Sequence, residues 1–288
     1  MEPIGNGIYT ALLTPFTETG AIDEPLTARL LAFQEAAGVL GVVVAGTTGE
    51  GPSLSAPEKV ALYELASRTR GQLRIIAGIL SCSLTEALFL TRNAARAGCN
   101  ALMVAPPFYY RAPLEGLITL YRALLEATEL PLILYNIPQL TCQPIPVALI
   151  ETLLPLPNLI GIKDSSGDPE SLQAYLRFTP RLKVWVGEEK LLLRNLQGGG
   201  AGSISGLANV FPERLVTLFH AYGDGRDAEG LQQLIDEVAD AIDAFPAPAN
   251  FKYALTLRGM PLSHVRPPLC DLNEAEQHAL QKAIQPYL

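Results

Sequence analysis

Short apolar segments alternate with longer helical patterns about eight times along the chain, and this alternation limits the folds open to it. The candidate strands are nearly continuous in Val, Ile and Leu, rather than alternating between apolar and polar residues. Strands of this kind are buried on both faces, as in parallel sheets that helices cover. We expect them at Gly7–Thr14, Gly41–Ala45, Leu73–Ala77, Ala101–Ala105, Leu132–Asn136, Leu159–Lys163, Lys183–Gly187 and Gly202–Ser205.

The segments between the strands carry apolar residues at three- and four-residue spacing, which predicts amphipathic helices. One of them begins with a capping box from Ser55 to Glu58, and Gly38 and Gly98 stand where helices are expected to end. The predicted helices are Leu26–Ala37, Ala56–Thr69, Leu84–Ala97, Leu114–Ala127, Pro146–Leu154, Pro169–Phe178, Glu189–Leu196 and Pro212–Tyr222.

Eight strand–helix units predict an α/β fold, a (β/α)8 TIM barrel. A doubly wound sheet is the main alternative, but the turn after the first strand, Thr14-Pro15-Phe16-Thr17, lacks the glycine fingerprint of that fold. After Gly223 the strand patterns end. We therefore expect a barrel catalytic domain at residues 1–223 and a C-terminal helical extension at residues 224–288. The helices expected in that extension are Ala228–Ala244, Asn250–Arg258 and Asn273–Ile284.

Composition and charge exclude several classes of function. The chain has 29 acidic and 21 basic residues, a net charge of −8, and no basic stripe, so nucleic acid is not an expected partner. Its apolar segments are far shorter than the ~20 residues that span a bilayer, and its first residues lack the features of a signal peptide. The four cysteines and three histidines are scattered. We expect a cytoplasmic protein with free thiols, no metal and no cofactor.

Lys163 is the residue that most suggests chemistry. It ends the apolar segment Leu159–Ile162, at the carboxyl end of a strand, where the reactive groups of barrels lie. Removing an amine from water lowers its pKa and makes it nucleophilic near neutral pH, and a neutral amine forms a Schiff base with a ketone or aldehyde. The structural alternative is a lysine that pairs with Asp164 or with a glutamate.

Other strand ends supply possible partners. Tyr135 ends the preceding strand, and because neighbouring strands lie about 5 Å apart, its phenol is expected near Lys163, where it can relay protons. The turn Gly46-Thr47-Thr48-Gly49 offers hydroxyls and backbone amides for a carboxylate, or it is an ordinary turn. The aromatic cluster Phe108-Tyr109-Tyr110 either lines the site or forms an oligomer contact.

These strand ends carry motifs that resemble those of the dihydrodipicolinate synthase / N-acetylneuraminate lyase family, along essentially the whole chain. The resemblance implies a (β/α)8 barrel with extra C-terminal helices, Schiff-base (class I) chemistry on pyruvate without a cofactor, and a homotetramer built as a dimer of dimers. The motifs are GTTGEGPSLS (Gly46–Ser55), APPFYYRAP (Ala105–Pro113), LYNIP (Leu134–Pro138), GIKDSSGD (Gly161–Asp168) and GSISGLANVFPE (Gly202–Glu213).

Matching the motifs position by position implies a role for each site residue. The imine-forming lysine falls on Lys163 and the proton-relay tyrosine on Tyr135, with Thr47 as its hydroxyl partner. Tyr109 falls on a further relay tyrosine that members of the family often insert from a neighbouring subunit. The positions implied for substrate binding are Gly46, Thr48, Gly187 and Ile204, of which Thr48 holds the pyruvate carboxylate and Ile204 presents its carbonyl to the imine nitrogen.

Leu140 departs from the pattern of the synthases in this family. They carry an arginine two residues after the proline of Tyr-Asn-x-Pro, which holds the carboxylate of the second substrate. With a leucine at this position, the sequence resembles instead the 2-keto-3-deoxy sugar-acid aldolases and sialate lyases, although Arg111 offers a substitute cation. We therefore expect reversible cleavage of a 2-keto-3-deoxy sugar acid, such as 2-keto-3-deoxygluconate, to pyruvate and an aldehyde. The alternatives are a dihydrodipicolinate synthase acting on aspartate semialdehyde, a sugar-acid dehydratase, and a non-catalytic sugar-acid-binding barrel.

Overall fold

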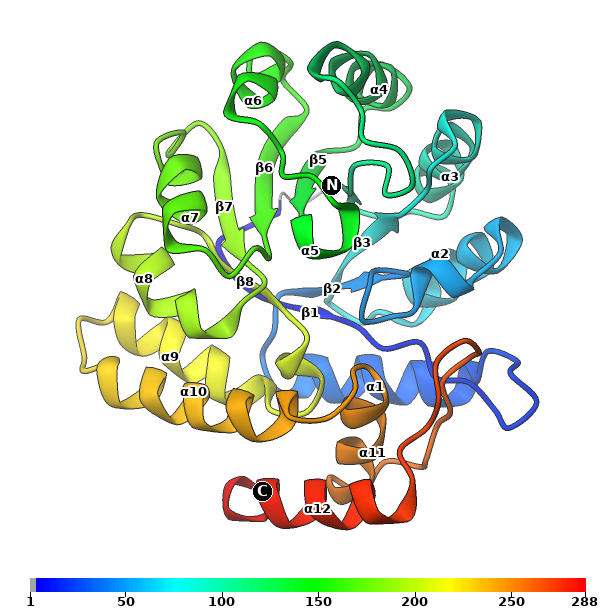
Figure 1. Cartoon of the computed structure of the whole chain (residues 1–288), viewed down its shortest axis with the longest axis vertical. Helices are drawn as coiled ribbons and strands as arrows, with labels where there is room; N and C mark the ends of the chain where they lie inside the picture. Colours follow the sequence, from blue (N-terminus) through cyan, green and yellow to red (C-terminus); the bar gives the residue numbers. More distant parts are fainter. Residues whose placement is uncertain (1–3) are drawn as a thin grey trace.

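Eight parallel strands close into a barrel in which each strand pairs with the next and β8 pairs with β1 (Figure 1). The structure is a computed structural model and describes residues 4–288. The closed parallel ring confirms the expected TIM barrel and excludes the doubly wound sheet. The strands are β1 Gly7–Ala11, β2 Gly41–Val44, β3 Arg74–Ile79, β4 Ala101–Val104, β5 Leu132–Asn136, β6 Leu159–Asp164, β7 Lys183–Val186 and β8 Gly202–Ser205.

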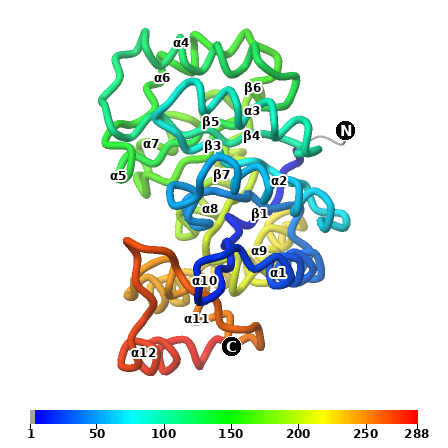
Figure 2. The backbone as a smooth tube through the Cα atoms, turned by 90° about the vertical axis from the view of Figure 1, so that its right-hand side faces the viewer, coloured from blue at the N-terminus to red at the C-terminus, as the bar shows by residue number. Residues whose placement is uncertain are grey.

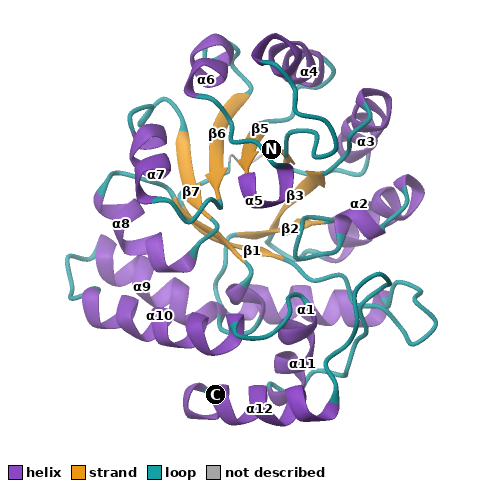
Figure 3. Ribbon diagram, in the orientation of Figure 1, coloured by secondary structure: helices purple, strands orange, loops and turns teal. Residues whose placement is uncertain are grey.

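The helices surround the ring of strands (Figure 3). The capping box from Ser55 to Glu58 is present, and Gly38 and Gly98 take positive φ angles of 84° and 82° just after helices end, which only glycine adopts readily. The helices are α1 Glu24–Ala36, α2 Ala56–Thr69, α3 Leu84–Arg96, α4 Leu114–Glu126, α5 Pro138–Thr141, α6 Val147–Leu153, α7 Pro169–Leu176, α8 Leu192–Gln197, α9 Pro212–Gly223, α10 Glu229–Asp243, α11 Ala249–Leu257 and α12 Glu274–Ile284.

The strands are buried on both faces, which explains their continuous apolar sequences. Alternate residues point into the barrel and form one cluster, which includes Val43, Ile76, Ile133 and Trp185. The residues between them point outward and pack against the helices in a second, larger cluster. Because side chains fill the interior, reactive groups are accessible only at the ends of the barrel.

Several bounds shift by one to three residues, such as β3, expected at Leu73–Ala77 and found at Arg74–Ile79, and two local features differ in kind from the sequence-based expectation. The first strand was expected to reach Thr14 but ends at Ala11. Beyond that point the chain leaves the ring, because the Leu13 amide donates to Asn209 Oδ1 and the Thr14 hydroxyl donates to the Gly49 carbonyl. The short helix α5 was not expected. It lies over the middle of the ring in Figure 1, directly after β5.

Helices α10, α11 and α12 follow the last strand–helix unit. Figure 2 shows them, in orange to red, to one side of the barrel. They pack on one another, and α10 also packs on α8 and α9. The division at residue 223 stays a prediction. No helix among residues 4–288 is long and apolar enough to cross a membrane.

Candidate active site

Lys163 and Tyr135 face each other at the carboxyl ends of β6 and β5. The two residues are register partners in the sheet, and Lys163 Nζ lies 4.6 Å from the centroid of the Tyr135 ring. Both side chains are almost fully buried, with exposed fractions of 4 % and 2 %. The proximity predicted from adjacent strand ends is therefore confirmed.

Lys163 is not held in an ion pair by any residue among 4–288. Asp164, the pairing partner considered from the sequence, has other partners: its Oδ1 atom accepts hydrogen bonds from Asn136 Nδ2 at 2.8 Å and from the Ser166 amide at 3.0 Å. A buried amine without a carboxylate partner loses hydration and gains no Coulombic compensation. This arrangement disfavours the ion-pair alternative and leaves the amine free to react.

The turn after β2 brings a hydroxyl to Tyr135. Thr47 Oγ1 lies 3.3 Å from the Tyr135 hydroxyl oxygen. The turn is closed by a hydrogen bond from the Glu50 amide to the Thr47 carbonyl (3.0 Å) and by one from the Gly51 amide to the Gly46 carbonyl (2.9 Å). Thr47, Tyr135 and Lys163 thus form one continuous chain of contacts.

The predicted substrate-binding residues border this group. A Cβ atom on Gly187 would stand 2.6 Å from Lys163 Cε, so the absence of a side chain there gives the lysine its space. Thr48 Oγ1 lies 3.5 Å from the position that a Cβ atom on Gly206, just beyond β8, would occupy. Ile204 belongs to the same interior cluster as Tyr135 and is fully buried. Their roles in binding stay predictions.

Tyr109 is not brought to the site by its own chain. It is 77 % exposed and stacks edge-on against Tyr110, with ring centroids 4.9 Å apart. Adjacent exposed aromatic residues of this kind are typical of interfaces. Within residues 4–288 it makes no hydrogen bond to Thr47 or Tyr135.

An apolar cavity of about 240 Å³ opens beside Thr47. Leu140, 54 % exposed, lines it, whereas Arg111 is exposed and is not among the lining residues. The wall thus presents neither the arginine nor the substitute cation considered from the sequence. The lining residues are Thr47, Pro52, Leu80, Ala105, Phe108, Ile137, Leu140 and Thr141.

Comparison with known protein families shows which family the chain belongs to. The pattern of the Dihydrodipicolinate synthetase family matches residues 5–287. The chain belongs to the dihydrodipicolinate synthetase family. It is therefore a lyase of the aldolase type, and the family resemblance seen in the strand-end motifs is confirmed.

Family members with solved structures share the whole fold. Dihydrodipicolinate synthase DapA-2 from Bacillus anthracis superposes with a TM-score of 0.94 at 32 % identity and covers 100 % of both chains. YagE from E. coli, solved in complex with pyruvate, gives a TM-score of 0.94 at 30 % identity over 98 % of both chains.

Curated family members are similar along their full length. A DapA-like lyase of Chloroflexus aurantiacus is 37 % identical over 97 % of this chain and 96 % of its own. The 4-hydroxy-tetrahydrodipicolinate synthase of Methanococcoides burtonii is 34 % identical over 97 % of each chain.

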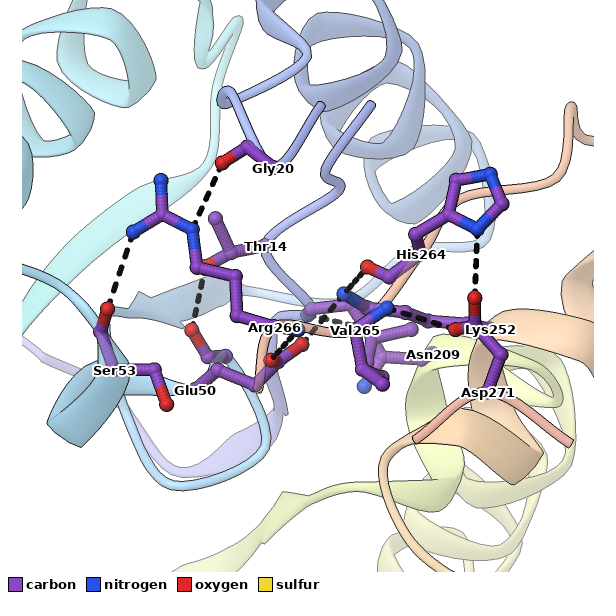
Figure 4. Close-up of polar contacts among 12 residues, drawn as sticks. Thr14, Gly20, Glu50, Ser53, Asn209, Lys252, His264, Val265, Arg266 and Asp271 are labelled. Atoms are coloured by element: carbon purple, nitrogen blue, oxygen red, sulfur yellow. Dashed lines mark hydrogen bonds and ion pairs between the residues drawn. The ribbon is translucent and has the colours of Figure 1, made fainter. Parts of the chain in front are cut away.

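One buried ionic cluster behind the site was not predicted from the sequence. Glu50, which closes the Thr47 turn, forms an ion pair with Lys252 of α11 at 2.6 Å, and the Arg266 amide donates to its other oxygen at 2.9 Å (Figure 4). Burial lowers the pKa of Lys252, and Glu50 opposes this shift. The only sequence signal was that Glu50 belongs to the Gly-Thr-Thr-Gly-Glu motif, because no motif marks its distant partners.

Gly187→Ala is expected to impair the lysine without unfolding the protein. The three atoms nearest to the added methyl group all belong to the side chains of Lys163, whose Cε lies at 2.6 Å, and Ser165, so these side chains must move. A displacement of this size lowers activity by on the order of 10²-fold. The measurement is the rate at which borohydride traps pyruvate on the protein, with thermal unfolding as a check. Gly223→Ala is the control, because its Cβ meets nothing within 4 Å; equal trapping rates in both variants would contradict the assignment.

Proposed function

We propose that the chain is a pyruvate-dependent class I aldolase that reversibly cleaves a 2-keto-3-deoxy sugar acid into pyruvate and an aldehyde. The observation that carries this proposal is the buried Lys163 amine, without an ion-pair partner among residues 4–288, beside the hydrogen-bonded pair of Tyr135 and Thr47. A nucleophilic amine and a proton relay in contact are what Schiff-base catalysis needs.

Each step of the reaction is assigned to a residue of the site. Lys163 attacks C2 of the keto acid, and the carbinolamine loses water to give a protonated imine. Tyr135, oriented by Thr47, takes the proton from the C4 hydroxyl while the C3–C4 bond breaks. The bonding electron pair moves into the C2–C3 enamine, because the imine nitrogen accepts charge, and the aldehyde leaves. Protonation of C3 and addition of water to the imine then release pyruvate and restore the amine.

The aldehyde side of the site supports a partner without a second carboxylate. Leu140 and its apolar neighbours offer no cation to a second carboxylate.

Dihydrodipicolinate synthase activity is the second candidate, since several similar family members are named 4-hydroxy-tetrahydrodipicolinate synthase. A direct comparison separates the two. Pyruvate release from 2-keto-3-deoxygluconate is measured with lactate dehydrogenase, and condensation of pyruvate with aspartate semialdehyde is measured in parallel. The proposal expects release in the first assay and little turnover in the second; the reverse result assigns the chain as a synthase.

Leu140→Arg is expected to shift this balance. A guanidinium in the apolar wall would bind the carboxylate of aspartate semialdehyde in a bidentate pair. Charge-assisted hydrogen bonds contribute about 1.5–3 kcal/mol, so kcat/KM for this aldehyde should rise by roughly 10- to 100-fold. Leu40→Arg, at an exposed leucine just before β2 at the opposite end of the barrel, is the control. If Leu140→Arg leaves kcat/KM unchanged, position 140 does not select the second substrate.

We also propose a homo-oligomer, a dimer of dimers, in which Tyr109 of one copy completes the relay of another. The exposed Tyr109–Tyr110 pair supports this arrangement. A cytoplasmic location stays a prediction.

A further inference from the structure

The carboxylate of Glu50 is a deeply buried charged group near the site. Its side chain is 0 % exposed, and that of its partner Lys252 is 1 % exposed. One carboxylate oxygen accepts from Lys252 Nζ and the other from the Arg266 amide. Because removing two charges from water costs more free energy than most pairs recover, a pair of this kind is weak evidence for stability alone. Stability alone therefore does not explain the pair, and we looked for a functional role.

Glu50 lies three residues after Thr47, and its own backbone closes the turn. The residue takes the left-handed conformation, with φ 54° and ψ 34°, which a residue with a side chain rarely adopts. In this conformation the Glu50 amide donates to the Thr47 carbonyl. The Thr47 hydroxyl in turn contacts Tyr135. A shift of the Glu50 side chain is thus passed through two hydrogen bonds to the proposed relay.

The groups that hold Glu50 come from the C-terminal extension, more than 200 positions along the chain. Lys252 Nζ also donates to the His264 carbonyl, so one ammonium group links α11, the segment after it and the turn. His264 is fixed by an Nδ1 contact of 2.7 Å to Asp271. Figure 4 shows these residues converging on Glu50 from α11 and the following segment.

Arg266 extends the same connection over the outside of the turn. Its Nε atom donates to the Gly20 carbonyl, and its two terminal nitrogens donate to the Ser53 carbonyl and to Glu58. Lys252 and Arg266 also lie over the ring of Phe16, at 4.5 and 4.3 Å from its centroid. Both cations are thereby fixed in position, and the turn that they hold is fixed with them.

We propose that Lys252 and Arg266, acting through Glu50, are positioning residues that hold the Thr47 turn in the geometry needed for proton transfer by Tyr135. The C-terminal extension is then part of the catalytic apparatus, although none of its residues touches substrate. This inference rests on the proposed Schiff-base function. It predicts that proton transfer fails while the Lys163 amine stays reactive.

The test needs no knowledge of the aldehyde, because pyruvate alone reports both steps. In D2O the imine loses a C3 proton to the relay and regains a deuteron, and NMR follows this exchange. Borohydride trapping of pyruvate on Lys163, measured by intact mass, counts the competent amines in the same sample. A merely structural defect lowers both signals in proportion to the folded fraction, whereas a positioning defect lowers exchange per trapped lysine.

Lys252→Met is the first variant, and Glu50→Gln/Lys252→Met is the second, because neutralising both partners avoids a stranded buried charge if the single variant does not fold. The control is Arg258→Met, which removes the ion pair with Glu213 at the end of the same helix α11, away from the turn. We expect exchange per trapped lysine to fall by on the order of 10²-fold in the Lys252 variants and to stay within about twofold in the control.

Two results would overturn the inference, and they differ from each other. A folded double variant that exchanges pyruvate as fast per trapped lysine as Arg258→Met would show that the cluster is only structural, with the proposed function intact. Absence of both trapping and exchange in the unmodified protein would instead refute the proposed function, and the inference with it.

Discussion

Lys163→Ala is expected to abolish turnover and pyruvate trapping altogether. No other residue among 4–288 places an amine beside Tyr135, so removal of Nζ removes the electron sink for carbon–carbon cleavage. Lys163→Arg should fail equally, because a guanidinium keeps the charge but is not a nucleophile at neutral pH. The measurement is pyruvate release from the keto acid together with intact mass after borohydride reduction.

Stability and a second lysine supply the controls for this prediction. The buried Lys163 amine has no ion-pair partner among residues 4–288, so its loss should leave the free energy of unfolding unchanged or higher. Lys183→Ala changes a lysine at the opposite end of the barrel, where Nζ donates to the Ile4 carbonyl, and should leave trapping intact. Normal turnover in a folded Lys163→Ala protein would refute the assignment.

Tyr135→Phe is expected to lower kcat by roughly 10²–10⁴-fold, the usual contribution of a positioned acid–base group. The substitution keeps the ring against which Lys163 packs and removes only the hydroxyl that contacts Thr47. The lysine should therefore still be trapped by pyruvate and borohydride, although slowly, because its nucleophilic amine is intact. Steady-state kinetics and C3 exchange of pyruvate in D2O measure the loss.

Tyr121→Phe is the matched control for this prediction. Tyr121 is equally buried, and its hydroxyl donates to the Val104 carbonyl on the helix-covered side of the barrel. Loss of that hydrogen bond should lower stability by about 1 kcal/mol and leave kcat unchanged. If both phenylalanine variants lose activity to the same extent, the Tyr135 hydroxyl has no special part in proton transfer.

Much of the barrel was predictable because each strand carries its own signal. A strand buried on both faces is mostly apolar, so β2 and β4, which contain only glycine and apolar residues, were predicted to within one residue. The end of β1 was not predictable, because Leu12, Leu13 and Thr14 continue the apolar pattern. The chain leaves the ring there only because Asn209 and Gly49, remote in sequence, take the next hydrogen bonds.

The same distinction, between local sequence signals and contacts with residues remote in sequence, applies to the site. The contact between Lys163 and Tyr135 follows from strand register alone, and the contact with Thr47 follows from the neighbouring turn at the same end of the barrel. The Glu50–Lys252 pair could not be predicted, since ion pairs between residues more than 200 positions apart leave no local pattern. The role of Tyr109 stays a prediction: its side chain is exposed, and the relay expected for it involves a second copy of the chain.

The central claim is that Lys163 forms an imine with pyruvate, and borohydride reduction tests it most directly. The unmodified protein is incubated with pyruvate, reduced, weighed intact and then digested for peptide mapping. We predict one pyruvate-derived adduct per chain, located on Lys163 and absent from Lys163→Ala. A folded protein that gains no adduct, or that carries it on another lysine, would contradict the claim.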